Sequence, residues 1–245
     1  MGIQGEAANL LNCRKGFTNM DLKTFSMPYL KTLKREINEM WMLVLSQHQK
    51  ACTALLSVDK DLAREIILVE ERVNSCQQFI ENDCENYFSL PSMQADSIPH
   101  AMYILKMSRQ LETVGDLAKK IATDILGVPS LFEEALLHKS KLPELFAKSN
   151  QLLEMAFAAF GENNSTLANI ILNRAEVFQE LISENGNTMI DYTRQYPYHR
   201  NQVLHVYSVI ESLRRTVEMS ANIADGIINY AHKTTDVPQV RKAAS

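Results

Sequence analysis

The sequence predicts an all-α protein made of two pseudo-symmetric three-helix bundles, with six long helices in total. Glycine and proline are scarce, at 8 and 7 of 245 residues, and they separate long segments with apolar residues at three- and four-residue steps. This spacing is typical of helices joined by short loops. No segment alternates strictly between apolar and polar residues, as a half-buried strand would. The stretch LETVGDLAKKIATD at 111–124 also matches the pattern of LRRTVEMSANIAD at 213–225, 102 residues later, so one three-helix unit is repeated.

The first predicted bundle covers residues 26–127. Its first helix begins after Ser26, has Pro28 in its first turn and runs through YLKTLKREINEMWMLVLSQHQKACTALLS. One apolar stripe marks the face that we expect to be buried. It consists of Leu30, Leu33, Ile37, Trp41, Val44, His48, Cys52 and Leu55.

The next two helices complete this bundle. The second begins at DKDLAREI and ends near Phe88. Its apolar stripe is Ile66, Val69, Val73, Cys76, Ile80, Cys84 and Tyr87. The third begins at SIPHAM, with Ser97 as N-cap and Pro99 in the first turn, and ends before GVPS at 127–130. The residues of this helix expected to face its neighbours are Leu111, Ala118, Ile121 and Ile125.

The second predicted bundle covers residues 128–233. Its first helix starts at a capping box formed by Ser130 and Glu133 and runs to about residue 161. Ser165 is the predicted N-cap of the next helix, and the last helix covers roughly 199–232. Outside the bundles, we expect residues 1–25 to be irregular and residues 234–245 to form a polar tail.

The composition narrows the classes of function. The formal net charge of −4, from 25 basic and 29 acidic residues, argues against nucleic-acid binding, which needs a basic face. No run of about 18 apolar residues is present, so we expect no direct membrane span. The N-terminus has no secretory signal pattern. The four cysteines form no CxxC pair, which favours a reducing, cytoplasmic location.

Two helices of the first bundle carry acidic side chains on a second face. Residues of the second helix recur at steps of 4, 3 and 4, which places them on one side. They are Glu70, Asn74, Gln77 and Glu81. On the third helix, Glu112 and Asp116 share a face, where like charges repel by a few tenths of a kcal/mol. Helices in a bundle lie about 8–10 Å apart, so carboxylates from both can reach one cation. Oxygen ligands suit Mg²⁺, Mn²⁺, Ca²⁺ or iron.

The alternative is that these acids form an ordinary solvated face on which water screens the charges. The second half of the chain does not repeat the pattern. Arg214 stands at the position equivalent to Glu112, and Glu218 at that of Asp116. An Arg–Glu pair four residues apart neutralises itself and needs no metal. Ala175 and Gln179 likewise replace the first two residues of the acidic stripe. We therefore expect at most one metal site, with Glu70, Glu81, Glu112 and Asp116 as candidate ligands.

These residues give the chain a resemblance to a known family. The segment LETVGDLAKKIA resembles the LERIGD-A--IA signature of the PhoU family, EERVN at 70–74 resembles that family's acidic-x-x-Val-Asn stretch, and LRRTVEMSANIAD resembles the second copy. The resemblance covers about residues 26–233. It implies two similar three-helix bundles related by a pseudo-twofold axis, and metal clusters bound by acidic motifs. On this chain Glu70, Glu112 and Asp116 match those motifs and Glu81 is acidic where the family has an acid. Gln77 replaces a usual Glu, so the chain resembles a divergent member.

The resemblance implies a non-enzymatic regulator of phosphate uptake and phosphate signalling that acts through protein–protein contacts and is modulated by a bound divalent or iron-type metal. The implied partners are components of a phosphate ABC transporter and a sensor histidine kinase. Such a protein is cytoplasmic and reaches the inner membrane through its partners. Self-association into a homodimer stays open.

Two other functions stay open at this point. The chain can be the cytoplasmic regulatory domain of a sodium–phosphate cotransporter, with residues 1–25 as the remnant of a linker. It can also be a phosphoesterase, because a metal site bridged by carboxylates can hydrolyse phosphate esters. Against an enzyme, the sequence shows no His, no second set of carboxylates and no nucleophile beside Glu112.

Overall fold

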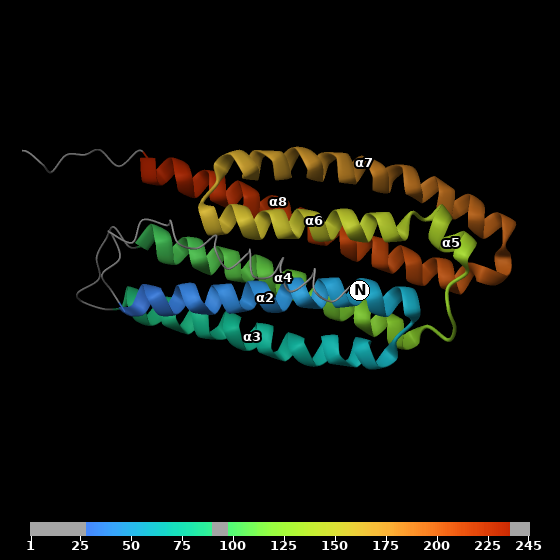
Figure 1. The fold of residues 1–245 in the computed structure, drawn as a ribbon, viewed down its shortest axis with the longest axis horizontal. Helices are drawn as coiled ribbons and strands as arrows, with labels where there is room; N and C mark the ends of the chain where they lie inside the picture. The colour runs from blue at the N-terminus through green and yellow to red at the C-terminus, as the bar shows by residue number, and fades with distance from the viewer. Residues whose placement is uncertain (1–27, 90–97, 236–245) are drawn as a thin grey trace, which may run out of the picture.

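A computed structural model describes residues 28–89 and 98–235 of the chain, and within those ranges it contains helices and connecting loops but no strands (Figure 1). Six of these helices are long, as predicted. The elements in order are α2 (Pro28–Ser57), α3 (Lys60–Phe88), α4 (Ile98–Gly127), α5 (Glu134–Lys139), α6 (Leu142–Glu162), α7 (Ser165–Gln195), the 3-10 helix η3 (Pro197–His199) and α8 (Arg200–Thr235).

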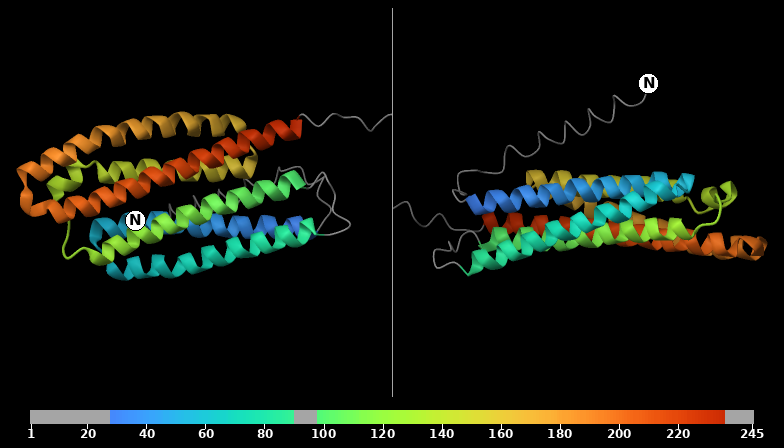
Figure 2. Two further views of the ribbon diagram at one scale, coloured as in Figure 1. Left: turned by 180° about the vertical axis from the view of Figure 1, so that it is seen from behind. Right: turned by 90° about the horizontal axis from the view of Figure 1, so that it is seen from below.

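The long helices form two bundles that lie side by side. Helices α2, α3 and α4 pack against one another, and so do α6, α7 and α8. The main contact between the bundles is made by α4 and α8, and α2 also touches α6. Figure 2 shows α4 and α8 adjacent in an elongated molecule. The all-α fold with two three-helix bundles is thus confirmed.

The core lies along the predicted apolar stripes. Leu33, Ile37, Trp41, Val44 and His48 of α2 are fully buried. The predicted face of α4 is buried too, at Leu111, Ala118, Ile121 and Ile125. One residue of the α3 stripe departs from the prediction, because Val69 is only half-buried and the adjacent Glu70 is buried in its place. The predictions for residues 1–25, Ser26, Ser97, the side chain of Leu30 and the end of the tail lie outside the described part.

The first helix of the second bundle is where the predicted boundary is wrong. The structure divides it into α5 and α6, and Glu133 is the N-cap residue of α5 but makes no side-chain capping bond, so the predicted capping box does not form. Lys141 adopts a left-handed conformation with φ of 50° between the two helices. Pro143 stands in the first turn of α6. Because proline has no backbone N–H and its ring crowds the preceding turn, a continuous helix through this point is disfavoured.

Helix α7 begins at the predicted place, with a different cap. The side chain of Asn164 accepts a hydrogen bond from the backbone N–H of Leu167 at 2.9 Å, so Asn164 is the N-cap and Ser165 is the first helical residue. Asn and Ser are both favoured N-cap residues. Because two favoured capping residues are adjacent, the sequence alone did not decide which of them is the N-cap.

Candidate functional site

The acidic stripe of α3 faces α4, where each of its two glutamates meets a basic side chain. Nζ of Lys119 donates to Oε2 of Glu70 at 2.7 Å. Nε of Arg109 donates to Oε1 of Glu81 at 3.1 Å. Both pairs cross from α4 to α3, so they join two helices of the first bundle.

Glu70 is the most unusual member of this group because its side chain is only 1% exposed. Its Oε2 binds Lys119, but Oε1 is buried and has no hydrogen-bond partner among the described residues. A buried carboxylate loses its hydration, which is costly unless a cation or several donors replace it. Glu70 therefore depends on the positive charge beside it.

Glu112 and Asp116 lie on α4 between the two basic residues. Burial raises the pKa of Glu112, and the negative charges of Asp116, Glu70 and Glu81 raise it further. Burial, then the charge of Glu70 and a side-chain hydrogen bond with Glu70, raise the pKa of Asp116, which Lys119 partly opposes. Because each acid makes ionisation of the others harder, these carboxylates share one electrostatic field.

The order of charges along α4 explains how this helix tolerates its acidic pair. Arg109 precedes Glu112 by three residues, and Lys119 follows Asp116 by three residues. Each acid thus has a basic residue three positions away, and side chains at this spacing are neighbours on one face of a helix. The hydrogen bond to Glu70 is the main cause that raises the pKa of Lys119. Neither basic residue was predicted to take part in the site, although their spacing is visible in the sequence.

The placement of these side chains does not fit a metal centre. Within residues 28–89 and 98–235, no group of three or more His, Cys, Asp or Glu side chains lies close enough to hold a metal ion. Glu81 is paired with Arg109, and Lys119 lies where a cation would meet Glu70. The predicted metal ligation by Glu70, Glu81, Glu112 and Asp116 stays a prediction.

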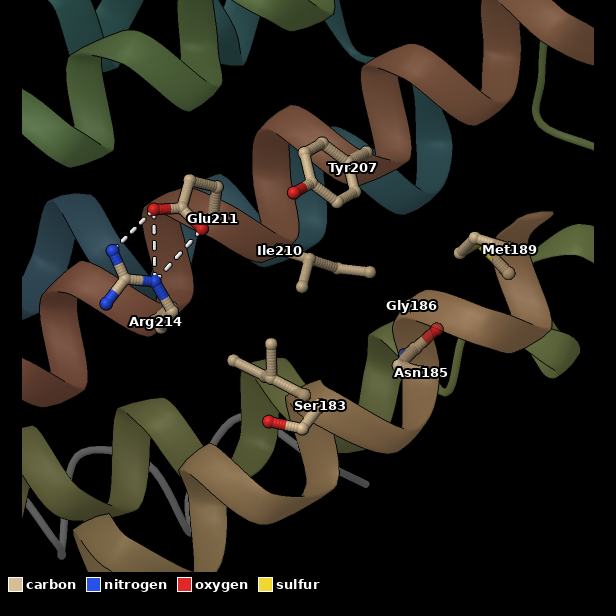
Figure 3. A pocket seen from close by; sticks show the side chains of 9 residues that line it. Ser183, Asn185, Gly186, Met189, Tyr207, Ile210, Glu211 and Arg214 are labelled. Carbon is tan, nitrogen blue, oxygen red and sulfur yellow. Dashed lines mark hydrogen bonds and ion pairs between the residues drawn. The ribbon is translucent and has the colours of Figure 1, made fainter.

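The equivalent place in the second bundle has a different chemistry, shown in Figure 3. Arg214 donates to both carboxylate oxygens of Glu211, with distances of 2.5 to 3.0 Å, and its second terminal nitrogen lies 3.4 Å from Glu218. This arrangement confirms the predicted pairing of Arg214 with Glu218 and adds a closer partner. On α7, Ala175 is buried and offers no ligand.

A cavity of about 300 Å³ opens beside this ion pair, between α7 and α8 (Figure 3). Gly186 lines it, and a Cβ placed on that residue would meet nothing within 4 Å. Its other lining residues are Ile182, Ser183, Asn185, Met189, Tyr207, Ile210, Glu211 and Arg214. The charged groups at its edge neutralise one another, so this cavity has no set of free carboxylates for a cation.

Comparisons with known proteins agree on one family. Residues 37–125, which include all four candidate ligands, match the PhoU domain. The chain is 26% identical over 212 residues to a phosphate-specific transport system accessory protein PhoU homolog of a Burkholderia species, covering 86% of this chain and 90% of the relative. It is 22% identical over 201 residues to PhoU homolog 1 of Thermotoga maritima, covering 81% and 85%.

Solved structures show the same fold. The crystal structure of PhoU from Pseudomonas aeruginosa matches with a TM-score of 0.78 at 19% identity, over 84% of this chain and 98% of that one. A phosphate transport system regulatory protein PhoU from Streptococcus pneumoniae matches with a TM-score of 0.74 at 23% identity, over 83% and 95%. Among the described residues, none of the helices is both long and apolar enough to cross a membrane.

Proposed function

We infer that this chain, a divergent relative of PhoU proteins, is a non-enzymatic regulator of phosphate uptake and phosphate signalling. The resemblance predicted from the sequence is confirmed, and the curated relatives are named accessory proteins of phosphate-specific transport systems. The observation that carries the proposal is the extent of this likeness, which covers 86% of the chain and runs through both bundles.

We propose that regulation works through contacts with a phosphate ABC transporter, a sensor histidine kinase, or both. We also propose that the protein acts in the cytoplasm, next to the membrane through its partners. In favour of contact over chemistry, acids of the candidate site in both bundles are paired with basic side chains, at Arg109–Glu81, Lys119–Glu70 and Arg214–Glu211. Crosslinking and affinity capture of the chain from native cells, grown in phosphate-rich and phosphate-poor medium, tests these partners by mass spectrometry.

The cotransporter-domain alternative has less support. The chain covers 90% and 86% of the length of two relatives that are named accessory proteins, which favours the accessory role. A phosphoesterase is also less well supported, because no histidine is among the groups that shift the pKa values of Glu112 and Asp116. Absence of p-nitrophenyl phosphate hydrolysis with Mn²⁺ present is the expected result, and metal-dependent turnover lost in Glu112→Gln would establish the enzyme.

We propose that any divalent or iron-type cation bound by the chain binds at one site, in the first bundle. The supporting observation is the contrast between the two halves, since Glu112 and Asp116 have raised pKa values while Arg214 lowers the pKa of Glu211. Calorimetric titration with Mn²⁺ should show at most one class of site. Joint replacement Glu112→Gln and Asp116→Asn should abolish it, whereas Glu218→Gln should leave it intact.

A further inference from the structure

Large apolar side chains gather at one end of the second bundle, on the loop before α5, at the end of α7, on η3 and in the first turns of α8. Tyr198 is 97% exposed, and Leu131 and Leu204 are each 64% exposed. We call this region the η3 end, and its exposed apolar residues are Leu131, Tyr196, Tyr198 and Leu204. Single exposed apolar residues are ordinary, but several in one place mark an interaction surface.

Hydrogen bonds hold the η3 end in a fixed shape. The side-chain amide of Gln202 donates from Nε2 to the backbone oxygen of Leu131 at 3.2 Å, and its Oε1 accepts from the backbone N–H of Glu133 at 3.1 Å. The hydroxyl of the buried Tyr192 lies 3.2 Å from Nδ1 of His199. These contacts tie the loop to α8 and η3 to α7, so the exposed side chains stand on a fixed frame.

Basic side chains stand beside these apolar groups. Arg200, Lys139 and Lys141 are exposed, and none of them forms an ion pair with another described residue. Their positive charge contrasts with the net charge of −4 of the whole chain. An ammonium or guanidinium group without a carboxylate beside it is available to an anionic group of a partner.

The acids at the η3 end do not cancel this charge. Asp191 is paired with Arg194, with Oδ1 at 3.3 Å from Nη1. Glu133 lies 4.0 Å from Nε2 of His199, and Glu134 is exposed. Within the described part of this end, three unpaired basic residues thus stand against two acids while the histidine is neutral, and its protonation increases the excess. Charge complementarity therefore favours an anionic occupant.

The shape of the molecule favours a flat occupant. Figures 1 and 2 show that the joined ends of α7 and α8 extend beyond the end of the first bundle. A planar surface can therefore touch the η3 end without meeting α2, α3 or α4. Tyrosine is suited to the headgroup layer of a bilayer, because its ring is apolar and its hydroxyl stays in contact with water.

We propose that the η3 end binds the surface of an anionic lipid bilayer. Tyr198, Leu131 and Leu204 enter the headgroup layer, while Arg200 and the two lysines lie against the lipid phosphates. Shallow apolar insertion and charge attraction act together, since a single weak signal does not hold a protein at a membrane. The proposal adds a lipid contact to the proposed regulatory role. It needs neither a transporter nor a kinase, so its failure would leave that role standing.

Flotation of the full chain with lipid vesicles measures this contact. The parent should bind vesicles of phosphatidylglycerol and phosphatidylcholine in equal parts, bind them less at raised salt, and not bind phosphatidylcholine alone. The joint replacement Tyr198→Ser and Leu131→Ser should weaken binding at least about tenfold. Arg200→Gln should weaken it about fivefold. Leu68→Ser is the matched control, because Leu68 is 65% exposed on α3 of the first bundle, and it should bind like the parent.

Fluorescence identifies the part of the molecule that touches the lipid. The single tryptophan of the chain, Trp41, is fully buried. A second tryptophan introduced by Tyr198→Trp should shift its emission to shorter wavelength, and brominated lipid should quench it, when anionic vesicles are added. Leu68→Trp should show neither change.

Each outcome decides the proposal. Failure of the parent to bind anionic vesicles would overturn it and would leave an acidic protein as the occupant of the η3 end. Equal binding to phosphatidylcholine alone would also overturn it, as would binding that survives the joint replacement Tyr198→Ser and Leu131→Ser. Equal quenching in Tyr198→Trp and Leu68→Trp would show that lipid touches no fixed place and would contradict it too.

Circular dichroism checks that the variants fold. Because the replaced side chains are exposed, the melting temperatures should match that of the parent. If the joint variant does not fold, Tyr198→Ser alone and Arg200→Gln provide the same test, and unchanged binding by both would overturn the proposal.

Discussion

Glu112 is held in a setting that disfavours its charge. Burial and three neighbouring acids raise the pKa of its carboxyl group above the ordinary value. The folded state therefore binds this proton more tightly than the unfolded state does, and ionisation at pH 7 weakens the fold. Stability contributed by this group rises as the pH falls through its folded pKa. The repulsion is partly screened, because Glu112 is only half-buried.

We expect Glu112→Gln to stabilise the protein at pH 7 by about 0.3–1 kcal/mol, because it removes like-charge repulsion of the size seen for such pairs. Urea denaturation at pH 7 and pH 4 measures the effect, which should shrink at the lower pH as the parent carboxyl becomes protonated. Glu218→Gln is the control. It removes a favourable partner of Arg214 and should not stabilise. Equal stabilisation by both variants would show that general surface charge, and not this cluster, is the cause.

His100 is buried at the contact between the bundles. The hydroxyl of Tyr230, on α8, lies 2.9 Å from its Nδ1. Burial, with a smaller effect from the charge of Lys34, lowers the pKa of His100 to about 4. The unfolded chain, with a histidine pKa near about 6.5, then binds more protons between these two values. The free energy of unfolding should therefore fall as the pH is lowered from about 6.5 to about 4.

Replacement His100→Phe removes this titration. Between pH 6.5 and 4 the free energy of unfolding of the parent should fall more steeply than that of the variant, by about 1.4 kcal/mol per pH unit at most. Above pH 7 the difference between the two proteins should be constant, since His100 is neutral in both folded and unfolded states. Parallel stability curves across the whole range would contradict the lowered pKa.

At the scale of the helix, two glycines allow a matched comparison. A Cβ on Gly115 of α4 would lie 3.1 Å from Cγ1 of Val73, a fully buried β-branched residue of α3. A Cβ on Gly186 of α7 would meet nothing within 4 Å. The first glycine lies where α3 and α4 pack closely, whereas the second is only a weak point of its helix.

Gly186→Ala should raise stability by about 0.5–1 kcal/mol, because alanine is the better helix former and has room. Gly115→Ala should lower stability by about 1 kcal/mol net, since overpacking against Val73 outweighs the same gain in helix propensity. Thermal unfolding followed by circular dichroism compares the two. A stabilised Gly115→Ala would mean that α3 and α4 adjust their separation easily.

The long helices were predictable because their apolar periodicity is unbroken over many turns, as in the stripe of α2 from Leu33 to Val44. The division into α5 and α6 was not predicted, because the same apolar periodicity continues through Lys141, although Pro143 is a sequence signal for a helix start at this point. A Ser-x-x-Glu pattern predicts a helix start just after the serine, but α5 begins only at Glu134, with Glu133 as its N-cap.

The position of the candidate site was predictable from the sequence, but only some of its residues were. Periodicity placed Glu70, Glu112 and Asp116 on faces that meet, and their mutual effect on pKa values agrees with this. Periodicity did not reveal that Lys119 reaches across to Glu70, because the direction of a long flexible side chain depends on the neighbouring helix. Lys119 of the same helix therefore helps α4 to tolerate two acids on one face.

At the scale of the whole molecule, polar contacts join the two bundles as well as apolar ones. His48 of α2 is fully buried, with Nδ1 bonded to Asn150 of α6 and Nε2 3.3 Å from Oγ1 of Thr216 on α8. Burial lowers its pKa, which favours the neutral ring. As predicted, His48 is a core residue. Buried polar contacts of this kind fix the geometry of an interface because each group needs its partner.

The repeated unit is asymmetric in charge. In the first bundle, Lys119 and Arg109 of α4 form ion pairs with acids of α3. In the second bundle, Arg214 pairs with Glu211 of its own helix, α8, and a cavity lies nearby, lined by Gly186. One half of the molecule therefore presents an acidic cluster with raised pKa values, and the other presents self-neutralised pairs. This difference is consistent with a protein whose two halves meet different surroundings.

The measurement that tests the regulatory role most directly is quantitative crosslinking of the tagged chain in its native cells, followed by affinity capture and mass spectrometry. We predict that a phosphate transporter component or a sensor histidine kinase is captured, and that its amount differs between phosphate-rich and phosphate-starved cells. A tag-only strain is the control for non-specific capture. Recovery of self-contacts alone in both media would contradict the account.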